Sequence, residues 1–426
     1  MNNNNQHIPA GYKLSPLGPI PEDWEVRRLG DLCKKIGSGI TPRGGQNVYL
    51  SQGHPFMRSQ NVANGRLLLD DIVFIDEFTH QKQKSTEIEF DDVLLNITGA
   101  SIGRCAIATQ EIVGGNVNQH VCIIRLKDKK LSHYICTFLL SYVGQKQIDS
   151  YQAGGNREGL NYDQIAAFKI CLPTQSEIIQ INNLLQLWDT AIAKQAQLVE
   201  KLTLRKRGLM QKLLTGKKRL KGFGGEWKLI KLGNIAERIT RKNEEDNKNV
   251  VTISAQRGFV VQTDFFNKSV ASEILDNYYL VHKDEFCYNK SYSNGYPMGA
   301  IKRLKSFDKA VVTTLYICFK LKETPKTNID FFEQYSESGL LNKELVKVAN
   351  EGGRAHGLLN VTPDDFFNMH MNVPSIEEQN AIASVLVDAD KEIELANKKL
   401  TRLQEEKKGL MQVLLTGKKR INKDKL

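Results

Sequence analysis

The chain has 426 residues, 41% of them hydrophobic and 25% charged, and its formal net charge is +11. This length exceeds one ordinary hydrophobic core, so we expect two or more globular domains. No run of 18 uncharged apolar residues occurs, which argues against a membrane span, and the polar start 1–6 does not resemble a signal peptide. Seven cysteines without a CxxC pair argue against a zinc site or a disulfide framework. We therefore expect reduced thiols, a cytoplasmic chain and no bound metal or cofactor.

The positive charge is concentrated in one part of the chain. Residues 172–221 contain 10 basic and 3 acidic side chains, whereas residues 1–171 contain 18 and 17. A basic surface suits an acidic partner such as nucleic acid. Since the larger segments are nearly neutral, charge alone is weak evidence for DNA binding.

The first segment, 1–171, reads as a mixed α/β domain. Short apolar runs at 92–98 and 120–125 are typical of strands, and glycine-rich turns separate them. Residues 130–143 have the pattern of a helix. Trp24, which follows Pro21-Glu-Asp, is expected to be a core anchor.

The next segment, 172–218, reads as one long helix. Pro173 cannot continue a helix backwards, and Thr174-x-x-Glu177 is a capping box. Gly216 suits the left-handed residue just beyond a helix C-terminus. Between these limits, apolar residues alternate at spacings of three and four, which is the pattern of a coiled-coil seam.

The chain then repeats this arrangement. Residues 219–372 read as a second α/β domain, with a strand at 315–320 and a helix at 330–349, and residues 373–426 as a second long helix. The stretch 172–220 aligns with 373–421 at a constant offset of 201, with 19 identical pairs among 49. Such similarity indicates an internal duplication. The parts that precede the helices barely align.

Two seams in one chain are expected to pack against each other as antiparallel helices. The fold class is therefore two mixed α/β domains separated by a two-helix coiled coil, with pseudo-two-fold symmetry. The seam residues, which we also expect to support partner docking, are Leu185, Trp188, Ile192, Leu202, Leu209, Leu386, Ile393, Leu400, Leu403 and Leu410. Lys206 and Lys407 fall at matching seam positions. Each lysine either fixes the register of the two helices, or packs its aliphatic chain along the seam and keeps its ammonium group in water where the helix ends diverge.

Motifs for catalysis are missing from the sequence. There is no Asn/Asp-Pro-Pro-aromatic tetrad for an extruded adenine and no phosphate-binding Gly-x-x-x-x-Gly-Lys-Ser/Thr loop. Pro363-Asp-Asp365 lacks a Glu-x-Lys partner, which argues against a nuclease core. We therefore predict a non-enzymatic chain.

The arrangement resembles the DNA-specificity subunit of Type I restriction-modification systems. The resemblance is carried by the helix endings Gly-Leu-Met-Gln-x-Leu-Leu-Thr-Gly-Lys at 208–217 and 409–418, and by the opening Pro21-Glu-Asp-Trp24. Further support comes from Gly39-Ile-Thr-Pro-Arg43, Arg58-Ser-Gln-Asn61 and the stretch 96–103. The second variable segment departs from these motifs, as expected if it reads other DNA.

The resemblance implies that each α/β domain reads one half of a bipartite, asymmetric double-stranded DNA target. It also implies that the paired helices set the spacing and dock two methylation subunits, which two restriction subunits can join. Adenine methylation with S-adenosylmethionine and restriction with ATP and magnesium would then take place in these partners. The chain itself would hold no cofactor.

Side chains that read bases need donors and acceptors on short, positioned loops. In the first domain the candidates are Thr41, Arg43, Arg58, Gln60, Asn61, Thr98, Ser101, Arg104, Asn118, Gln119 and Arg157. In the second domain they are Lys290, Tyr292, Ser293, Asn294, Arg303 and Arg354. Arg157 and Arg354 both follow Gly-Gly, and their alternative role is to pair with a carboxylate at the foot of a long helix.

Two other interpretations stay open from the sequence. A coiled-coil scaffold that presents two modules for ligands other than DNA would explain the helices and the nearly neutral domains. An enzyme such as a fused nuclease is opposed by the missing motifs.

Overall fold

The computed structural model describes residues 8–152, 159–262, 275–323, 327–349 and 359–421. The chain divides into two compact units. The first unit comprises Met1–Gln195 and Lys399–Leu426, and the second comprises Ala196–Lys398. Each unit therefore contains one α/β domain, part of the long helix α6 and part of the long helix α12. The predicted domain boundaries at 171, 218 and 372 stay predictions.

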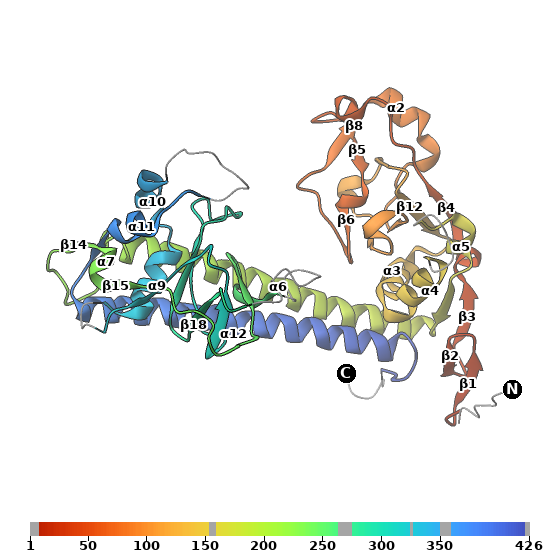
Figure 1. Cartoon of the computed structure of the whole chain (residues 1–426). Helices are drawn as coiled ribbons and strands as arrows, with labels where there is room; N and C mark the ends of the chain where they lie inside the picture. Colours follow the sequence, from red (N-terminus) through yellow and green to blue (C-terminus); the bar gives the residue numbers. More distant parts are fainter. Residues whose placement is uncertain (1–7, 153–158, 263–274, 324–326, 350–358, 422–426) are drawn as a thin grey trace. The chain divides into compact units, whose positions relative to one another are not determined.

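The first unit contains one main sheet and several smaller sheets (Figure 1). The strands are β1 (Tyr12–Ser15), β2 (Gly18–Pro21), β3 (Glu25–Arg28), β4 (Cys33–Ser38), β5 (His54–Met57), β6 (Val62–Ala63), β7 (Arg66–Leu67), β8 (Val73–Ile75), β9 (Val93–Asn96), β10 (Cys105–Ile107), β11 (Asn116–Val117), β12 (Val121–Leu126) and β13 (Lys169–Leu172). The helices are α1 (Leu29–Leu32), α2 (Glu77–Lys82), α3 (Ser132–Leu140), α4 (Tyr142–Gln152) and α5 (Tyr162–Ala166). Single 3₁₀ turns are η1 (Gly45–Val48), η2 (Ser59–Asn61), η3 (Lys84–Thr86), η4 (Gly99–Ser101), η5 (Gln110–Ile112) and η6 (Lys129–Leu131).

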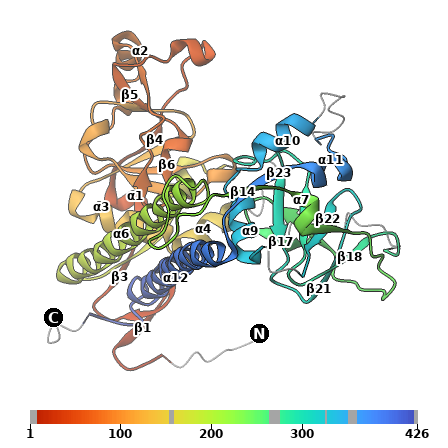
Figure 2. The same cartoon turned by 90° about the vertical axis from the view of Figure 1, so that its left-hand side faces the viewer.

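The second unit repeats the mixed architecture. Its strands are β14 (Lys228–Lys231), β15 (Ala236–Ile239), β16 (Val251–Ser254), β17 (Gly258–Val261), β18 (Tyr279–His282), β19 (Phe286–Asn289), β20 (Ala300–Arg303), β21 (Lys309–Val312), β22 (Ile317–Leu321) and β23 (His370–Val373). Its short helices are α7 (Leu232–Ile235), α9 (Ile329–Glu337), α10 (Asn342–Val348) and α11 (Pro363–Asn368). In Figure 2, α10 and α11 lie close to β14 and β23.

The main sheets of the two units have the same topology. In the first unit the order is β4-β12-β9-β10, and in the second it is β15-β22-β19-β20, with every neighbouring pair antiparallel. The duplication therefore extends to the α/β domains, although their sequences barely align. The predicted mixed α/β fold class is confirmed.

The first sheet is buried on both faces, which explains the continuous apolar runs of its strands. Successive strand residues point to opposite faces. Val93 and Leu95 on β9 belong to the core that includes α3 and the start of α6, whereas Leu94 belongs to a second core beneath β5 and β11. Burying one such leucine stabilises the fold by about 1.5–3 kcal/mol.

Both long helices begin and end close to the predicted residues. They are α6 (Gln175–Leu213) and α12 (Ile376–Leu414), each with 39 residues, which gives a length of about 58 Å at ~1.5 Å per residue. Gly216 and Gly417, just beyond the two ends, have φ values of +69° and +70°. At the first start, the backbone N–H of Glu177 donates to Thr174 Oγ1 at 3.4 Å and the backbone N–H of Thr174 donates to Glu177 Oε2 at 3.3 Å, so the capping box is present.

Within each unit the long-helix segments pack antiparallel. In the first unit, Ile181 and Leu185 share a core with Leu414, and in the second unit Leu213 shares one with Ile382 and Leu386. This packing confirms the predicted coiled coil. Of the predicted seam residues, Leu185 and Leu386 are fully buried, with 2% and 0% of their surface exposed. The half-buried ones are Trp188, Ile192, Leu202, Leu209, Ile393, Leu400, Leu403 and Leu410.

Ion pairs at equivalent positions connect the two helices in both units. Lys407 Nζ lies 2.5 Å from Asp189 Oδ1 in the first unit, and Lys206 Nζ lies 2.6 Å from Asp390 Oδ1 in the second. The two ion pairs are equivalent in the repeat, because Lys206 and Lys407 are 201 residues apart, and so are Asp189 and Asp390. These contacts favour the interpretation in which the lysines fix the register.

The predicted helix at 330–349 is divided in the structure. It comprises α9 and α10, and Gly339 between them has a φ of +75°. A left-handed residue cannot continue an α-helix. The predicted helix at 130–143 is likewise interrupted, because Ser141 between α3 and α4 is extended, with a φ of −72° and a ψ of 164°.

Candidate nucleic-acid interface

Four polar segments meet at one edge of the main sheet of the first unit. We call this edge the first polar edge; it comprises residues 39–43, 58–61, 97–104 and 118–120. Strand direction brings the segments together: Ser38 at the end of β4 pairs with Cys122, and Asn96 at the end of β9 pairs with Val121. Strand β11 runs parallel to β5, so the residues that follow both strands also lie at this edge.

Direct contacts hold these segments together. The backbone N–H of Asn118 donates to Met57 O at 2.9 Å, and the N–H of Ile97 donates to His120 O at 3.0 Å. Thr98 Oγ1 lies 2.5 Å from His120 Nδ1. A Cβ on Gly39 would lie 1.7 Å from Val117 O, so only glycine allows residues 39–43 to approach this closely.

The sequence candidates at the first polar edge fall into two groups. Asn61 and Asn118 are buried, and their side chains satisfy local backbone groups, such as the N–H groups of Arg58 and His120 at 3.0 Å. They position the turns. Arg43, Gln60, Arg104 and Gln119 are exposed, and Thr41, Arg58, Thr98 and Ser101 are half-buried.

Arg58 is more constrained than the other two arginines of this edge. Its Nη2 donates to the backbone oxygen of Asp71 at 2.7 Å and to Asp71 Oδ2 at 3.1 Å, and the guanidinium lies over the Tyr49 ring at 5.6 Å. No hydrogen bond or ion pair involves the side chains of Arg43 and Arg104 within the described part of the chain. These two guanidinium groups remain available to a ligand.

An equivalent edge exists in the second unit. The second polar edge comprises residues 240–243, 254–257, 290–299 and 313–316. Ile239 at the end of β15 pairs with Cys318, and Tyr288 near the end of β19 pairs with Ile317, so the residues beyond these strands lie together. Lys290, Tyr292, Ser293 and Asn294 are at this edge, and Tyr292 is 68% exposed.

A cavity of about 540 Å³ opens at the second polar edge. Its polar lining residues come from β16, the β16–β17 turn, β19 with the segment after it, and the residue before β22: Thr252, Ser254, Gln256, Arg257, Asn289, Ser291, Ser293 and Tyr316. Gln256 and Arg257 are not among the DNA-reading residues predicted from the sequence. Residues 250–261 carry an alternating apolar pattern with a glycine after Gln-Arg, which is the signal of a hairpin that presents these two residues at its turn.

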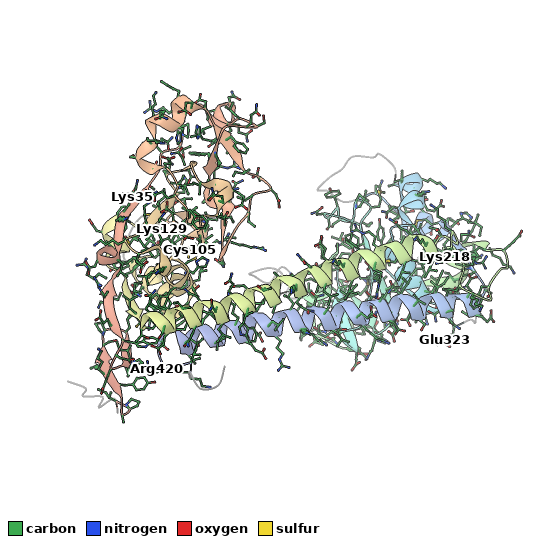
Figure 3. The ribbon with its side chains drawn as sticks, turned by 180° about the vertical axis from the view of Figure 1, so that it is seen from behind. Lys35, Cys105, Lys129, Lys218, Glu323 and Arg420 are labelled. Carbon is green, nitrogen blue, oxygen red and sulfur yellow. The ribbon has the colours of Figure 1, made fainter. Side chains whose placement is uncertain are left out.

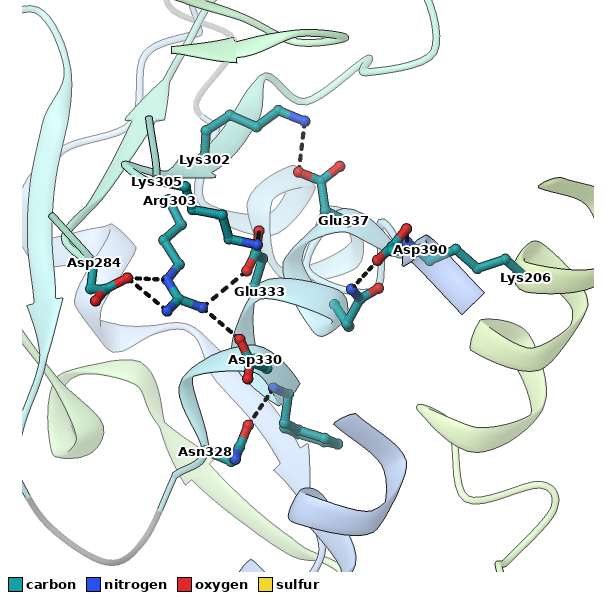
Figure 4. A network of polar contacts seen from close by, with 12 residues as sticks. Lys206, Asp284, Lys302, Arg303, Lys305, Asn328, Asp330, Glu333, Glu337 and Asp390 are labelled. Atoms are coloured by element: carbon teal, nitrogen blue, oxygen red, sulfur yellow. Dashed lines mark hydrogen bonds and ion pairs between the residues drawn. The ribbon is translucent and has the colours of Figure 1, made fainter. Parts of the chain in front are cut away.

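Arg303 lies away from the second polar edge. It ends β20 and pairs with Phe286 at the start of β19, so it is at the opposite end of the sheet. Figure 4 shows its guanidinium among carboxylates. It donates to Asp330 Oδ1 at 2.6 Å and lies 2.7 Å from Asp284 Oδ1, and its side chain is only 12% exposed. These contacts give Arg303 a structural role, so we leave it out of the proposed interface.

Arg157 and Arg354 lie outside the described residues. The foot of each long helix nevertheless contains an arginine–carboxylate pair. Arg420, which follows α12 (Figure 3), donates to Glu177 Oε1 at 2.7 Å, and Arg219 donates to Glu378 Oε2 at 2.5 Å. Neither pair is evident from the sequence, because the arginine and its carboxylate lie 243 residues apart in one pair and 159 in the other.

The foot of α6 also involves the N-terminal motif. Trp24 is 1% exposed, as expected for a core anchor, and its Nε1 donates to Glu177 Oε2 at 3.1 Å. Burial acts to raise the pKa of Glu177, but hydrogen bonds from Arg420, Thr174 and Trp24 outweigh it and leave this pKa below its usual value. The carboxylate therefore stays charged in a closed, hydrogen-bonded site.

No group of three or more His, Cys, Asp or Glu side chains suited to a metal ion occurs among the residues that the structure describes. Within the same ranges, none of the helices has both the length and the apolar character needed to cross a bilayer.

Comparisons with known proteins identify the class. Residues 21–203 match the family model of the Type I restriction modification DNA specificity domain. The chain is 25% identical to the putative type I restriction enzyme MjaX specificity subunit of Methanocaldococcus jannaschii, across 96% of this chain and 97% of that protein. It is 24% identical to the MjaVIII specificity subunit of the same organism, across 94% of each chain.

A solved structure has the same fold. The Type I restriction-modification S subunit from M. genitalium superposes with a TM-score of 0.53 at 15% identity, and the match covers 92% of this chain and 96% of that one. Residues 21–203 thus match the Type I DNA specificity domain family, and nearly the whole chain is similar to Type I specificity subunits. The resemblance inferred from the helix endings is confirmed. These relatives carry the name of specificity subunits, which agrees with the prediction of a non-enzymatic chain.

Proposed function

We propose that this chain selects the DNA target of a Type I restriction-modification complex by reading two separate half-sites. The first polar edge reads one half and the second polar edge reads the other. The observation that carries the proposal is the recurrence of one sheet topology with unlike polar side chains at equivalent edges. A shared scaffold with different surface chemistry suits the recognition of two different sequences.

The chemistry of both edges suits base reading. Arginine matches the acceptor pair of guanine, and glutamine or asparagine matches the donor and acceptor of adenine. The first edge presents Arg43, Arg104 and Gln119, and the second presents Asn294 and Tyr292. At the first edge, the exposed side chains lie on turns that the buried Asn61 and Asn118 hold in place, which is the positioning that sequence reading requires.

We further propose that the paired long helices set the spacing between the half-sites and dock two methylation subunits. Exposed apolar residues on α6, such as Leu187 and Leu204, provide contact area for such partners. Adenine methylation, and restriction by two further subunits, would be performed by the partners with S-adenosylmethionine, ATP and magnesium. Double-stranded DNA is then the ligand of this chain, and a cytoplasmic location stays a prediction.

Selection from a pool of random duplexes tests this function. The chain, purified with its methylation subunits, is expected to enrich sequences with two short defined blocks that are separated by a fixed number of unspecified base pairs. Affinity for a selected duplex is expected to fall linearly on a log–log plot against salt concentration, because phosphate contacts release counterions. Enrichment of no common sequence would contradict the proposal and would favour a scaffold for ligands other than DNA.

A further inference from the structure

An asparagine occupies the same position in both main sheets. Asn96 ends β9 and Asn289 ends β19, and these strands are the third in β4-β12-β9-β10 and in β15-β22-β19-β20. Each asparagine is followed two residues later by a hydroxyl residue, Thr98 or Ser291. The overall sequences around them differ, so this equivalence emerges from the topology.

Both asparagines make the same kind of contact. Asn96 Nδ2 donates to Ser59 O at 2.9 Å, and Asn289 Nδ2 donates to Ile253 O at 3.1 Å. Asn96 therefore ties the end of its strand to the turn at 58–61 after β5. Asn289 ties the end of its strand to Ile253 on β16, directly before the turn at 254–257.

The two turns present equivalent glutamines. Gln60 and Gln256 are both exposed. Gln60 Nε2 donates to Asp71 Oδ2, and Gln256 Nε2 donates to Asn294 O at 2.9 Å. Each contact uses one N–H of the amide and fixes its orientation. The second N–H and the Oε1 atom remain, which is the donor and acceptor pair that adenine N7 and N6 require.

The second turn belongs to a two-stranded ribbon that can enter a groove. Strands β16 and β17 pair from Val251 with Val261 to Ser254 with Gly258, and Gly258 has a φ of +73°. A three-residue loop closed by a left-handed glycine is a common tight hairpin. The major groove of B-DNA admits a two-stranded β-ribbon.

We propose that Gln256 reads a base in the second half-site, with adenine as the preferred partner, and that Asn96 and Asn289 are positioning residues that hold the two reading turns. This inference rests on the proposed function and adds a residue and a hairpin that the sequence candidates did not include. The turn at 254–257 is thereby the counterpart of the Arg58-Ser-Gln-Asn61 turn. Gln60 has the same reading role in the first half-site.

The test applies the random-duplex selection to variants of the full chain in complex with its methylation subunits. Gln256→Ala is expected to relax the preference at one or two adjacent base pairs of one half-site by about tenfold or more, with the other half-site unchanged. Gln256→Glu keeps the shape of the side chain but replaces its N–H donors with an acceptor. It is expected to shift that preference from adenine towards cytosine, whose N4 donates.

Two further variants test the positioning role of Asn289 and provide a control. Asn289→Asp retains an oxygen that can accept from the N–H of Ser291, now 3.0 Å from Asn289 Oδ1, but removes the donor to Ile253 O. It is expected to weaken the base preference at the same base pairs as Gln256→Ala. The matched control is Lys283→Ala, an exposed residue that precedes β19 at the opposite end of the sheet. It is expected to leave the preference unchanged.

The outcomes distinguish this inference from the proposed function. If the unaltered complex enriches a two-part sequence but Gln256→Ala and Gln256→Glu both preserve it, the inference is overturned and the function stands. Uniform weakening on every duplex would also overturn it, because that result indicates a phosphate or structural contact. If the unaltered complex enriches no sequence, the proposed function fails first. Thermal melting of each variant shows whether its fold is retained.

Discussion

At the scale of single residues, the arginines of the first polar edge differ in what holds their guanidinium groups. Arg58 is held by Asp71 and Tyr49, whereas Arg104 is exposed at the end of the segment 97–104. We expect Arg104→Ala to weaken binding to one half-site by about 1–3 kcal/mol and to leave the base preference of the other half unchanged. Binding to duplexes with single altered base pairs measures this. The control is Lys129→Ala, in the turn beyond the opposite end of β12.

The charged foot of α6 predicts an effect of pH on stability. The pKa of Asp23 is lowered by its hydrogen bond with Arg420, and the pKa of Glu177 is also lowered. A carboxylate with a lowered folded-state pKa adds stability above its unfolded pKa, which is near 3.9 for Asp and 4.3 for Glu. This stability is lost as the pH falls through the lowered folded-state values.

We therefore expect Glu177→Gln to be less stable than the unaltered chain at pH 7 and to lose less stability between about pH 5 and pH 2. Urea unfolding at a series of pH values measures the difference. Glu405→Gln, an exposed change on α12, is the control. Parallel pH profiles for Glu177→Gln and the unaltered chain would show that the Glu177 site does not contribute.

The sequence predicted these residue roles unevenly. Trp24 and the capping residue Thr174 were identifiable because their contacts are local or apolar. Arg303 looked like a DNA contact because nothing in its neighbourhood along the chain reveals Asp330 and Glu333, which arrive from α9. Asn96 and Asn289 were missed as a pair because their equivalence depends on strand order.

At the scale of elements, the structure requires glycine at only one of two positions near the C-terminus of α12. Gly417 has a φ of +70°, and a Cβ there would lie 2.4 Å from Pro21 Cδ. Gly409 lies within α12, where a Cβ would meet nothing within 4 Å. We expect Gly417→Ala to destabilise the chain by about 1–3 kcal/mol and Gly409→Ala to stabilise it by about 0.5–1 kcal/mol. Chemical denaturation of both variants is the measurement; equal effects would contradict this account.

The helix seam provides a second prediction. Leu386 is fully buried in the core that includes Leu213, whereas Leu395 on the same helix is 66% exposed. We expect Leu386→Asp to cost about 3–5 kcal/mol or more, because it removes a packed side chain and buries a charge. Leu395→Asp is expected to change stability by about 0.5 kcal/mol or less. A folded Leu386→Asp variant that still assembles with methylation subunits would count against the paired helices.

The long helices were the most predictable elements, because their caps and seam are encoded within the helices themselves. The strands at β9, β12 and β22 were predictable from apolar runs that are buried on both faces. The hairpin β16–β17 and the break at Gly339 were not predicted. The break depends on Gly339 adopting a left-handed conformation, which a glycine in the sequence does not by itself reveal, whereas the alternating pattern of residues 250–261 does indicate the hairpin.

At the scale of the whole molecule, the duplication links all of these features. Pairs at an offset of 201, such as Lys206–Asp390 with Lys407–Asp189 and Arg219–Glu378 with Arg420–Glu177, recur in both units. The scaffold is thus specified twice by the same residues. The side chains of the two polar edges do not recur in this way. This difference is expected if the architecture is kept and the proposed reading surface varies.

The register of the helices follows from those pairs. We expect a double-mutant cycle of Lys206→Ala and Asp390→Ala to give a favourable coupling of about 0.5–1 kcal/mol, because Lys206 is largely buried beside a partly exposed carboxylate. Unfolding of the unaltered chain, both single variants and the double variant provides the four free energies. If the effects of the two single changes simply add, Lys206 and Asp390 do not interact, and the alternative role applies, in which the lysine only reaches water along its aliphatic chain.

Mapping of the adenines that become methylated tests the central claim most directly. DNA exposed to the complex of this chain with its methylation subunits is expected to carry methyl groups in one two-part sequence with a constant gap, and Arg104→Ala and Gln256→Ala are expected to alter different parts of it. Methylation without a two-part sequence, or the same alteration from both variants, would contradict the account.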